Sequence, residues 1–197
     1  MKLVVGLGNP GKEYERTPHN VGFGVIDILS RRCNCMLRRS LRFKAHMVRT
    51  MCNGENVRLV KPRVFMNESG CVVAAITRKL EINLADLVII LDDVNLPLGR
   101  LRIRPGGSAG GHKGLMSVID SLGDDRFARV RLGTGRRGRL DLTADVLTPF
   151  PEELQETAEN MLVTAADAVE CLVACGLEIA MNKFNAGEDT QSGGTRN

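Results

Sequence analysis

Residues 3–29 read LVVGLGNPGKEYERTPHNVGFGVIDIL, and this stretch decides the fold class. Its first residues form a short apolar run that ends in glycine, which is typical of a buried strand. From Asn20 to Arg32 the apolar side chains recur at helical spacing, so a helix is predicted there. A buried strand followed by a helix is the repeating unit of an α/β layered fold.

The same alternation continues along the chain. Two strands, over residues 43–51 and 56–61, are predicted on either side of Asn53-Gly54, because this dipeptide favours a tight hairpin turn. The other expected elements are strands over residues 87–91, 100–104 and 130–132, and helices over residues 66–80, 112–122 and 151–183, the last with a break at Gly176. We therefore expect one α/β domain over residues 1–185, with a twisted, mixed and mostly parallel sheet flanked by helices in three layers.

Composition limits the class of protein. The first ten residues hold an apolar run too short for a secretory signal, and no apolar run is long enough to cross a bilayer. The six cysteines lack the spacing and the histidine partners of a zinc site. We expect a cytoplasmic protein with reduced thiols, no membrane partner and no metal ion. Residues 186–197 have almost no apolar content and are expected to form a disordered tail.

Charge is distributed unevenly. Residues 1–149 hold 25 Lys and Arg against 14 Asp and Glu, whereas residues 150–197 hold 2 against 9. The basic side chains fall into three clusters: Arg38, Arg39, Arg42 and Lys44; Arg100, Arg102 and Arg104; and Arg126, Arg129, Arg131, Arg136, Arg137 and Arg139. Clustered cations bind polyanions through phosphate contacts, so a nucleic acid is the expected partner.

Two familiar motifs are present but lack their required context. Residues 6–11 match the G-x-G-x-x-G dinucleotide fingerprint, yet a charged run and Pro18 follow where a helix should begin. Residues 106–110 match the G-x-S-x-G nucleophile elbow, which needs an acid and then a histidine further along the chain. His112 follows the serine by only four residues, too close to complete such a triad.

A third group of residues is more consistent. Asn9 follows the first strand, His19 lies on the next loop, and Asn20 is placed to cap the following helix. Loops at the carboxyl ends of parallel strands form the sites of open α/β sheets, and Asp92 ends the most hydrophobic strand. A carboxylate that orients one imidazole nitrogen leaves the other free to accept a proton from water. Asn9 and Asn67 carry neutral amides suited to hold a carbonyl or an oxyanion.

With these residues in view, the chain resembles the bacterial peptidyl-tRNA hydrolase family. The resemblance runs from Met1 to about Asn185 in six blocks: VGLGNPGKEY at 5–14, TPHNVGF at 17–23, KPRVFMNESG at 61–70, LDDVNLPLGRLRIR at 91–104, GSAGGHKGL at 107–115 and VRLGTGR at 130–136. The order of the blocks over nearly the whole chain makes this resemblance specific.

The resemblance implies the roles of several residues. His19 would be the base that activates water, Asp92 its orienting acid, and Asn9 the residue that distinguishes blocked from free aminoacyl-tRNA. Three further residues, Tyr14, Phe65 and Asn67, would line the groove for the peptide and the tRNA 3′ end, and Arg102, Arg104 and Arg131 would contact tRNA phosphates. The implied substrate is peptidyl-tRNA, the implied reaction is hydrolysis of its ester bond, and the implied protein is a monomer without cofactor.

Two positions test the resemblance. Asp92 and Asp93 are adjacent and point to opposite faces of a strand; the family register selects Asp92, whereas the sequence alone leaves both open. Lys113 stands where the family usually has asparagine, and an ammonium group cannot accept a hydrogen bond, although it can pair with phosphate. A non-catalytic RNA-binding protein of the same fold is therefore the alternative class.

Overall fold

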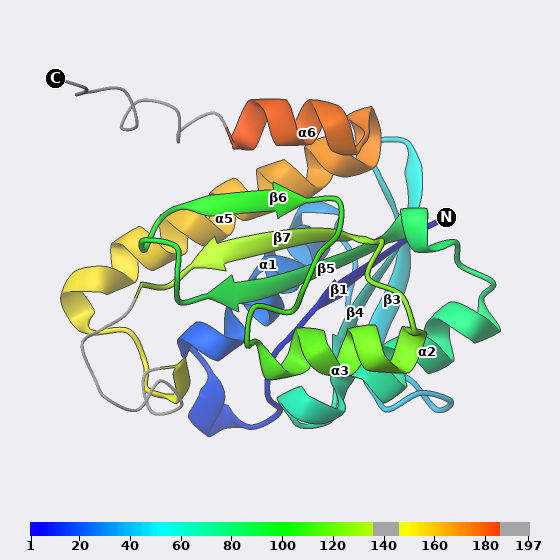
Figure 1. The fold of residues 1–197 in the computed structure, drawn as a ribbon, viewed down its shortest axis with the longest axis horizontal. Coiled ribbons are helices and arrows are strands. Elements are labelled where there is room, and N and C mark those ends of the chain that lie inside the picture. The colour runs from blue at the N-terminus through cyan, green and yellow to red at the C-terminus, as the bar shows by residue number, and fades with distance from the viewer. Residues whose placement is uncertain (136–145, 186–197) are drawn as a thin grey trace, which may run out of the picture.

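The computed structural model describes residues 1–135 and 146–185, in which the strands form one seven-stranded sheet of order β2-β3-β4-β1-β5-β7-β6 (Figure 1). The strands are β1 (Lys2–Gly6), β2 (Arg38–Arg39), β3 (Ala45–Cys52), β4 (Glu55–Pro62), β5 (Leu87–Asp93), β6 (Leu101–Arg104) and β7 (Ala128–Gly133). The central strands β4, β1, β5 and β7 run parallel, while β2, β3 and β6 add antiparallel edges. This confirms the predicted mixed α/β sheet.

The β3–β4 hairpin turns at the predicted dipeptide. Asn53 and Gly54 have positive φ angles of 49° and 83°, the backbone geometry of a type I′ turn. The turn sets the register that pairs His46 with Lys61. It therefore fixes which side chains of these two strands share a face of the sheet.

Helices cover both faces of the sheet, which confirms the three-layer arrangement (Figure 1). The helices are α1 (Val21–Arg32), α2 (Ser69–Lys79), α3 (Lys113–Leu122), α5 (Glu152–Cys175) and α6 (Leu177–Phe184). Apolar side chains of α1, α5 and α6 pack on one face, and those of α2 and α3 on the other. The helix predicted over residues 66–80 begins with a separate 3-10 turn, Met66–Glu68. The C-terminal helix breaks at Gly176, where φ is 92°.

Close glycine contacts bring the helices down onto the sheet. A Cβ on Gly6 would lie 2.2 Å from the carbonyl oxygen of Gly22, so β1 and α1 approach at a distance that only glycine allows. A Cβ on Gly70 would lie 1.8 Å from the carbonyl oxygen of Ser117, which fixes the α2–α3 contact in the same way. The first contact holds the start of α1, and with it His19, against the carboxyl end of the sheet.

Three further sequence predictions concern membrane spans, the state of the cysteines and the C-terminal tail. No helix within residues 1–135 and 146–185 is long and apolar enough to cross a membrane. The six cysteines lie in this part of the chain and all are free thiols. The predicted tail, residues 186–197, lies outside the described residues, as do Arg136, Arg137 and Arg139 of the third basic cluster.

Candidate active site

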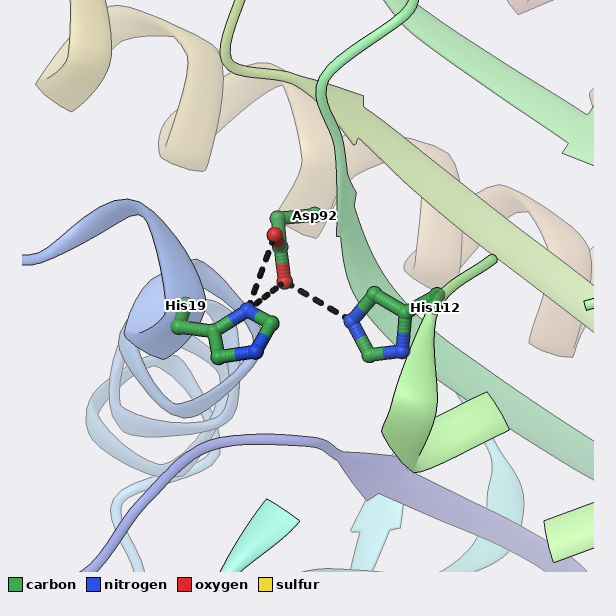
Figure 2. A group of neighbouring side chains, drawn as sticks. All are labelled: His19, Asp92 and His112. Carbon is green, nitrogen blue, oxygen red and sulfur yellow. Dashed lines mark hydrogen bonds and ion pairs between the residues drawn. The ribbon is translucent and has the colours of Figure 1, made fainter. Parts of the chain in front are cut away.

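The site begins with one buried carboxylate that holds two histidines (Figure 2). Asp92 lies at the end of β5 with 2% of its side chain exposed. The Nδ1 atom of His19 lies 2.9 Å and 3.0 Å from the two carboxylate oxygens. The Nε2 atom of His112 lies 2.9 Å from Asp92 Oδ1. Asp92 comes from the end of β5, His19 from the 3-10 turn before α1 and His112 from the residue before α3, so the fold alone brings them together.

The hydrogen bonds fix where the ring protons lie. The backbone N–H of Leu115 donates to Nδ1 of His112 at 3.0 Å, so this nitrogen is an acceptor. The other nitrogen of His112 therefore carries the proton and donates it to Asp92. Nδ1 of His19 faces a carboxylate and donates likewise, which leaves Nε2 of His19 with a free lone pair. A neutral imidazole oriented in this way is a general base.

Asp92 remains ionised in this environment. Burial acts to raise the pKa of its carboxyl group, but the charge and hydrogen bonds of His112 and then of His19 outweigh burial, and the pKa is held well below its usual range. A charged Asp92 can stabilise the imidazolium that forms when His19 accepts a proton. The site thus contains a base and the negative charge that compensates its protonation.

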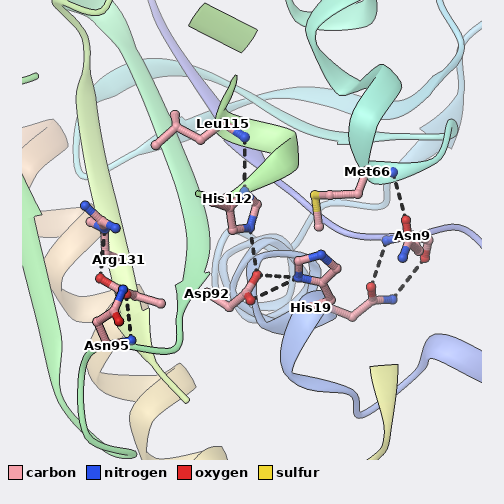
Figure 3. A network of polar contacts seen from close by, with 10 residues as sticks. Asn9, His19, Met66, Asp92, Asn95, His112, Leu115 and Arg131 are labelled. Carbon is pink, nitrogen blue, oxygen red and sulfur yellow. Dashed lines mark hydrogen bonds and ion pairs between the residues drawn. The ribbon is translucent and has the colours of Figure 1, made fainter. Parts of the chain in front are cut away.

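Asn9 is fixed by the loops on either side of it (Figure 3). Its backbone N–H donates to Oδ1 of Asn20 at 2.8 Å, and its carbonyl oxygen accepts from Nδ2 of Asn20 at 3.0 Å. Its own Oδ1 accepts from the backbone N–H of Met66 at 2.8 Å. The side-chain amide N–H groups of Asn9 therefore remain available. Asn20 occupies the N-cap position of α1 as predicted, but its side chain makes no capping hydrogen bond and instead braces Asn9.

The two adjacent aspartates have different partners. Asp93 lies on the opposite face of β5 from Asp92, where its Oδ2 pairs with Nε of Arg131 at 2.9 Å. Its Oδ1 accepts from the backbone N–H of Asn95 at 2.9 Å, which shapes the turn after β5. Asp92 alone faces the histidines, as the family register implied. Asp93 anchors a basic side chain.

The same three residues have the chemical types of a metal site. The candidate ligand atoms of His19, Asp92 and His112 lie within 4.8 Å of one another, the one such group among the described residues. Coordination through Nε2 of His112 would require a deprotonated nitrogen there, while Nδ1 already accepts from the N–H of Leu115. The proton placement suits a hydrogen-bonded acid–base group and does not fit a metal ion.

Comparison with known proteins assigns the family. A model of the family described as peptidyl-tRNA hydrolase matches residues 3–192. The chain belongs to the peptidyl-tRNA hydrolase family. It is 45% identical over 186 residues to the peptidyl-tRNA hydrolase of Synechococcus sp. (strain JA-2-3B'a(2-13)), covering 94% of this chain and 83% of that one. The enzyme of Desulforudis audaxviator is 44% identical, with 99% and 98% covered. A crystal structure of peptidyl-tRNA hydrolase from Acinetobacter baumannii superposes with a TM-score of 0.89 at 32% identity, covering 94% of this chain and 95% of that one.

In this member of the peptidyl-tRNA hydrolase family, a cavity of about 200 Å³ opens beside the histidines. His19, Asp92 and His112 line it together with Lys113 and Arg131. His19 therefore lies against a space in which a water molecule and an ester can meet. Of the two cations, Arg131 is paired with Asp93, which also lines the cavity, whereas Lys113 is exposed.

The other residues that the peptidyl-tRNA hydrolase resemblance selected lie around this centre. Phe65 and Asn67 are exposed on either side of Met66, whose backbone is bonded to Asn9. Tyr14 is half-buried in the 3-10 turn Lys12–Tyr14 and does not line the cavity that contains His19. On edge strand β6, Arg102 pairs in register with Arg131, and Arg104 is exposed.

Two residues were misjudged from the sequence. His112 was set aside as too close to the G-x-S-x-G serine, yet it donates to the carboxylate of Asp92. The signal was its position at the start of a helix after a glycine-rich loop. Arg129 was counted among the phosphate-binding cations, but its side chain is buried and its guanidinium donates to the carbonyl oxygens of Gly107 and Asp125. It holds the glycine-rich loop in place and is not a surface cation.

Proposed function

We propose that this protein hydrolyses the ester bond between a peptide and the 3′ ribose of tRNA, with His19 as the base that activates water. The observation that carries this role is the pair of contacts at 2.9 Å and 3.0 Å from Nδ1 of His19 to Asp92. These contacts leave Nε2 unprotonated beside a cavity. Family membership supports the activity, because the chain is similar over nearly its whole length to several peptidyl-tRNA hydrolases.

The reaction follows from the proton positions. Nε2 of His19 removes a proton from water while the water oxygen bonds to the ester carbonyl carbon. The resulting tetrahedral intermediate carries a negative oxygen, which the free amide N–H groups of Asn9 are suited to stabilise. The C–O bond to the ribose then breaks, and His19 returns the proton to the departing 3′ oxygen. Asp92 stabilises the imidazolium between these two proton transfers.

The remaining site residues are proposed to bind the substrate. Phe65 and Asn67 are exposed next to the anchored Met66, where they can contact the peptide or the terminal nucleotide, and Tyr14 lies on the neighbouring loop. Lys113 and Arg131 border the cavity and are suited to contact phosphate. Arg102 and Arg104 extend this basic face along β6, and the tRNA acceptor end would lie over them.

A release assay tests the function. N-acetyl-aminoacyl-tRNA should be cleaved rapidly and unblocked aminoacyl-tRNA slowly. His19→Ala should abolish release of tRNA while the circular dichroism spectrum stays unchanged. The control is Glu13→Ala, which replaces an exposed side chain on the same loop and should retain full turnover. Wild-type turnover of His19→Ala would exclude His19 as the base.

The second candidate function is RNA binding without catalysis, which the lysine at position 113 favours. Lys113 lines the cavity beside His112, where an asparagine would offer an acceptor. Tight tRNA binding with no cleavage of the blocked substrate would establish this alternative. If Lys113→Asn leaves the release rate unchanged, Lys113 is a neutral variant.

We further propose that the protein acts in the cytoplasm as a monomer. Analytical sedimentation of the purified protein can test its monomeric state.

A further inference from the structure

A large groove lies on the far side of the loop that carries His19. It has a volume of about 980 Å³ and runs between this loop, α1, the first half of α5 and the ends of β3 and β4. Asn9 and Asn20 line its inner wall, whereas none of the histidines bonded to Asp92 does. Apart from Asn9, no residue that the proposed reaction or substrate contacts use lines this groove.

One end of the groove is strongly cationic. His46, Lys61 and Arg63 line it, and Arg39 pairs in register with His46 on the neighbouring strand. Lys61 is already neutralised by Asp27, whose two carboxylate oxygens lie 2.7 Å and 2.9 Å from its Nζ. Within residues 1–135 and 146–185, Arg39 and Arg63 are exposed and have no acidic partner. This cationic end therefore holds two uncompensated guanidinium groups beside a histidine.

His46 responds to these charges. Burial lowers the pKa of His46, the nearby cations Arg63, Lys61 and Arg39 lower it further, and only Asp27 acts in the opposite direction. An anion bound among these groups would reverse that balance and favour the imidazolium. A rise in the pKa of His46 would therefore indicate an anion bound at this position.

The surrounding surface indicates what kind of anion fits. Residues 28–54 contain seven Lys and Arg and no Asp or Glu. Arg31, Arg38, Arg42 and Lys44 are exposed in this segment, which leads from the end of α1 across edge strand β2 to the cationic end of the groove. A single small phosphate would occupy one point, whereas a phosphodiester chain can use the whole stretch.

We propose that the cationic end formed by Arg39, His46, Lys61 and Arg63 binds the phosphate backbone of tRNA, as a second RNA contact away from the catalytic cavity. This proposal rests on the proposed function for one point only, namely that the bound RNA is tRNA. The contact lies on β2, β3 and the end of β4, whereas the predicted acceptor contacts lie on β6 and β7 at the opposite edge of the sheet. The catalytic edge would then be flanked by RNA contacts on both sides.

The test compares two double variants of equal charge. Arg39→Ala/Arg63→Ala removes the two uncompensated cations. The backbone contacts of both residues, Arg39 with His46 on β3 and the N–H of Arg63 with the carbonyl oxygen of Lys44, do not depend on the side chains. Arg78→Ala/Lys79→Ala removes the same charge from exposed positions outside the groove and outside residues 28–54. The first variant should weaken binding of deacylated tRNA roughly tenfold, and the slope of the logarithm of its binding constant against the logarithm of salt concentration should be shallower by about 2. The control variant should bind tRNA with nearly the wild-type affinity and salt dependence. Cleavage of N-acetyl-aminoacyl-adenosine, which lacks the RNA body, should stay at the wild-type rate in both.

Several results would overturn the proposal. An unchanged tRNA affinity, or a loss equal to that of the control, removes the contact. A weakened affinity together with lost cleavage of the adenosine substrate means that the catalytic loop was damaged, and it counts against a separate site. In NMR titrations of the histidine rings, added tRNA should raise the pKa of His46. A response of His46 only to inorganic phosphate would assign the site to a small anion. Loss of binding only to phosphatidylglycerol vesicles would assign it to a lipid surface.

Discussion

Replacing Asp92 with asparagine tests the arrangement of protons at the centre of the site. His112 must donate through Nε2, because its Nδ1 accepts from the backbone, so the amide oxygen of an asparagine would stay with His112. The amide NH₂ group would then face Nδ1 of His19 and convert that nitrogen into an acceptor. The proton of His19 would move to Nε2, which is the wrong tautomer for a base.

The size of the effect follows from the charge that is lost. The imidazolium of His19 and the carboxylate of Asp92 are in direct contact, and two unit charges about 4 Å apart interact by about 4 kcal/mol at an effective dielectric constant of 20. At about 1.4 kcal/mol per tenfold change in rate, this alone lowers turnover by about 10³. The tautomer change adds to it, so we expect a loss of about 10³ to 10⁴ in kcat.

The assay is release of N-acetyl-aminoacyl-tRNA under single-turnover conditions, with Asp93→Asn as the matched control. Asp93 makes no contact with the histidines, and an asparagine there keeps an acceptor for the backbone of Asn95, so its turnover should fall by less than about tenfold. If Asp92→Asn retained more than a tenth of the wild-type rate, the proposed proton positions would be wrong. A larger loss for Asp93→Asn would transfer the orienting role to that residue.

Four further predictions follow from the same structure. Gly70→Ala should cost about 3 kcal/mol or more in the free energy of urea unfolding, because its Cβ would meet backbone; Gly24→Ala, which meets only a flexible leucine, should change it by about 1 kcal/mol or less. Burial raises the pKa of Cys52 to about 12, so in the native protein its thiol should resist iodoacetamide while the exposed Cys71 is alkylated; equal rates would contradict this. Arg129→Ala should release the glycine-rich loop, seen as faster amide exchange at residues 106–110, with unchanged protection there as the opposing result. The fold lowers the pKa of the Asp92 carboxyl, so the ionised carboxylate stabilises the folded protein above about pH 4, and this contribution to the free energy of unfolding is lost as the pH falls through the folded pKa. The difference in unfolding free energy between wild type and Asp92→Asn, measured by urea titration, should therefore narrow below about pH 4.

The sequence by itself determined the layered α/β class, because hydrophobic periodicity is a local property of each segment. The hairpin at Asn53-Gly54 and the break at Gly176 were predicted for the same reason, since each depends on the backbone conformation of one or two residues. The resemblance also selects His19 and Asp92 from the sequence alone. Their contact across 73 residues was an expectation that only the fold could confirm.

Tertiary structure decided which polar groups meet. His112 became part of the site because the glycine-rich loop brings its ring to Asp92, and no spacing along the chain encodes that approach. Asn20 braces Asn9 where a helix cap was expected, because two loops adjacent in space compete for its side chain. Arg129 and Arg131 are alternate residues of one strand with similar sequence context, yet one is buried under a loop and the other pairs with Asp93. Hydrogen-bond partners and burial depend on packing between distant segments, so they are properties of the folded chain.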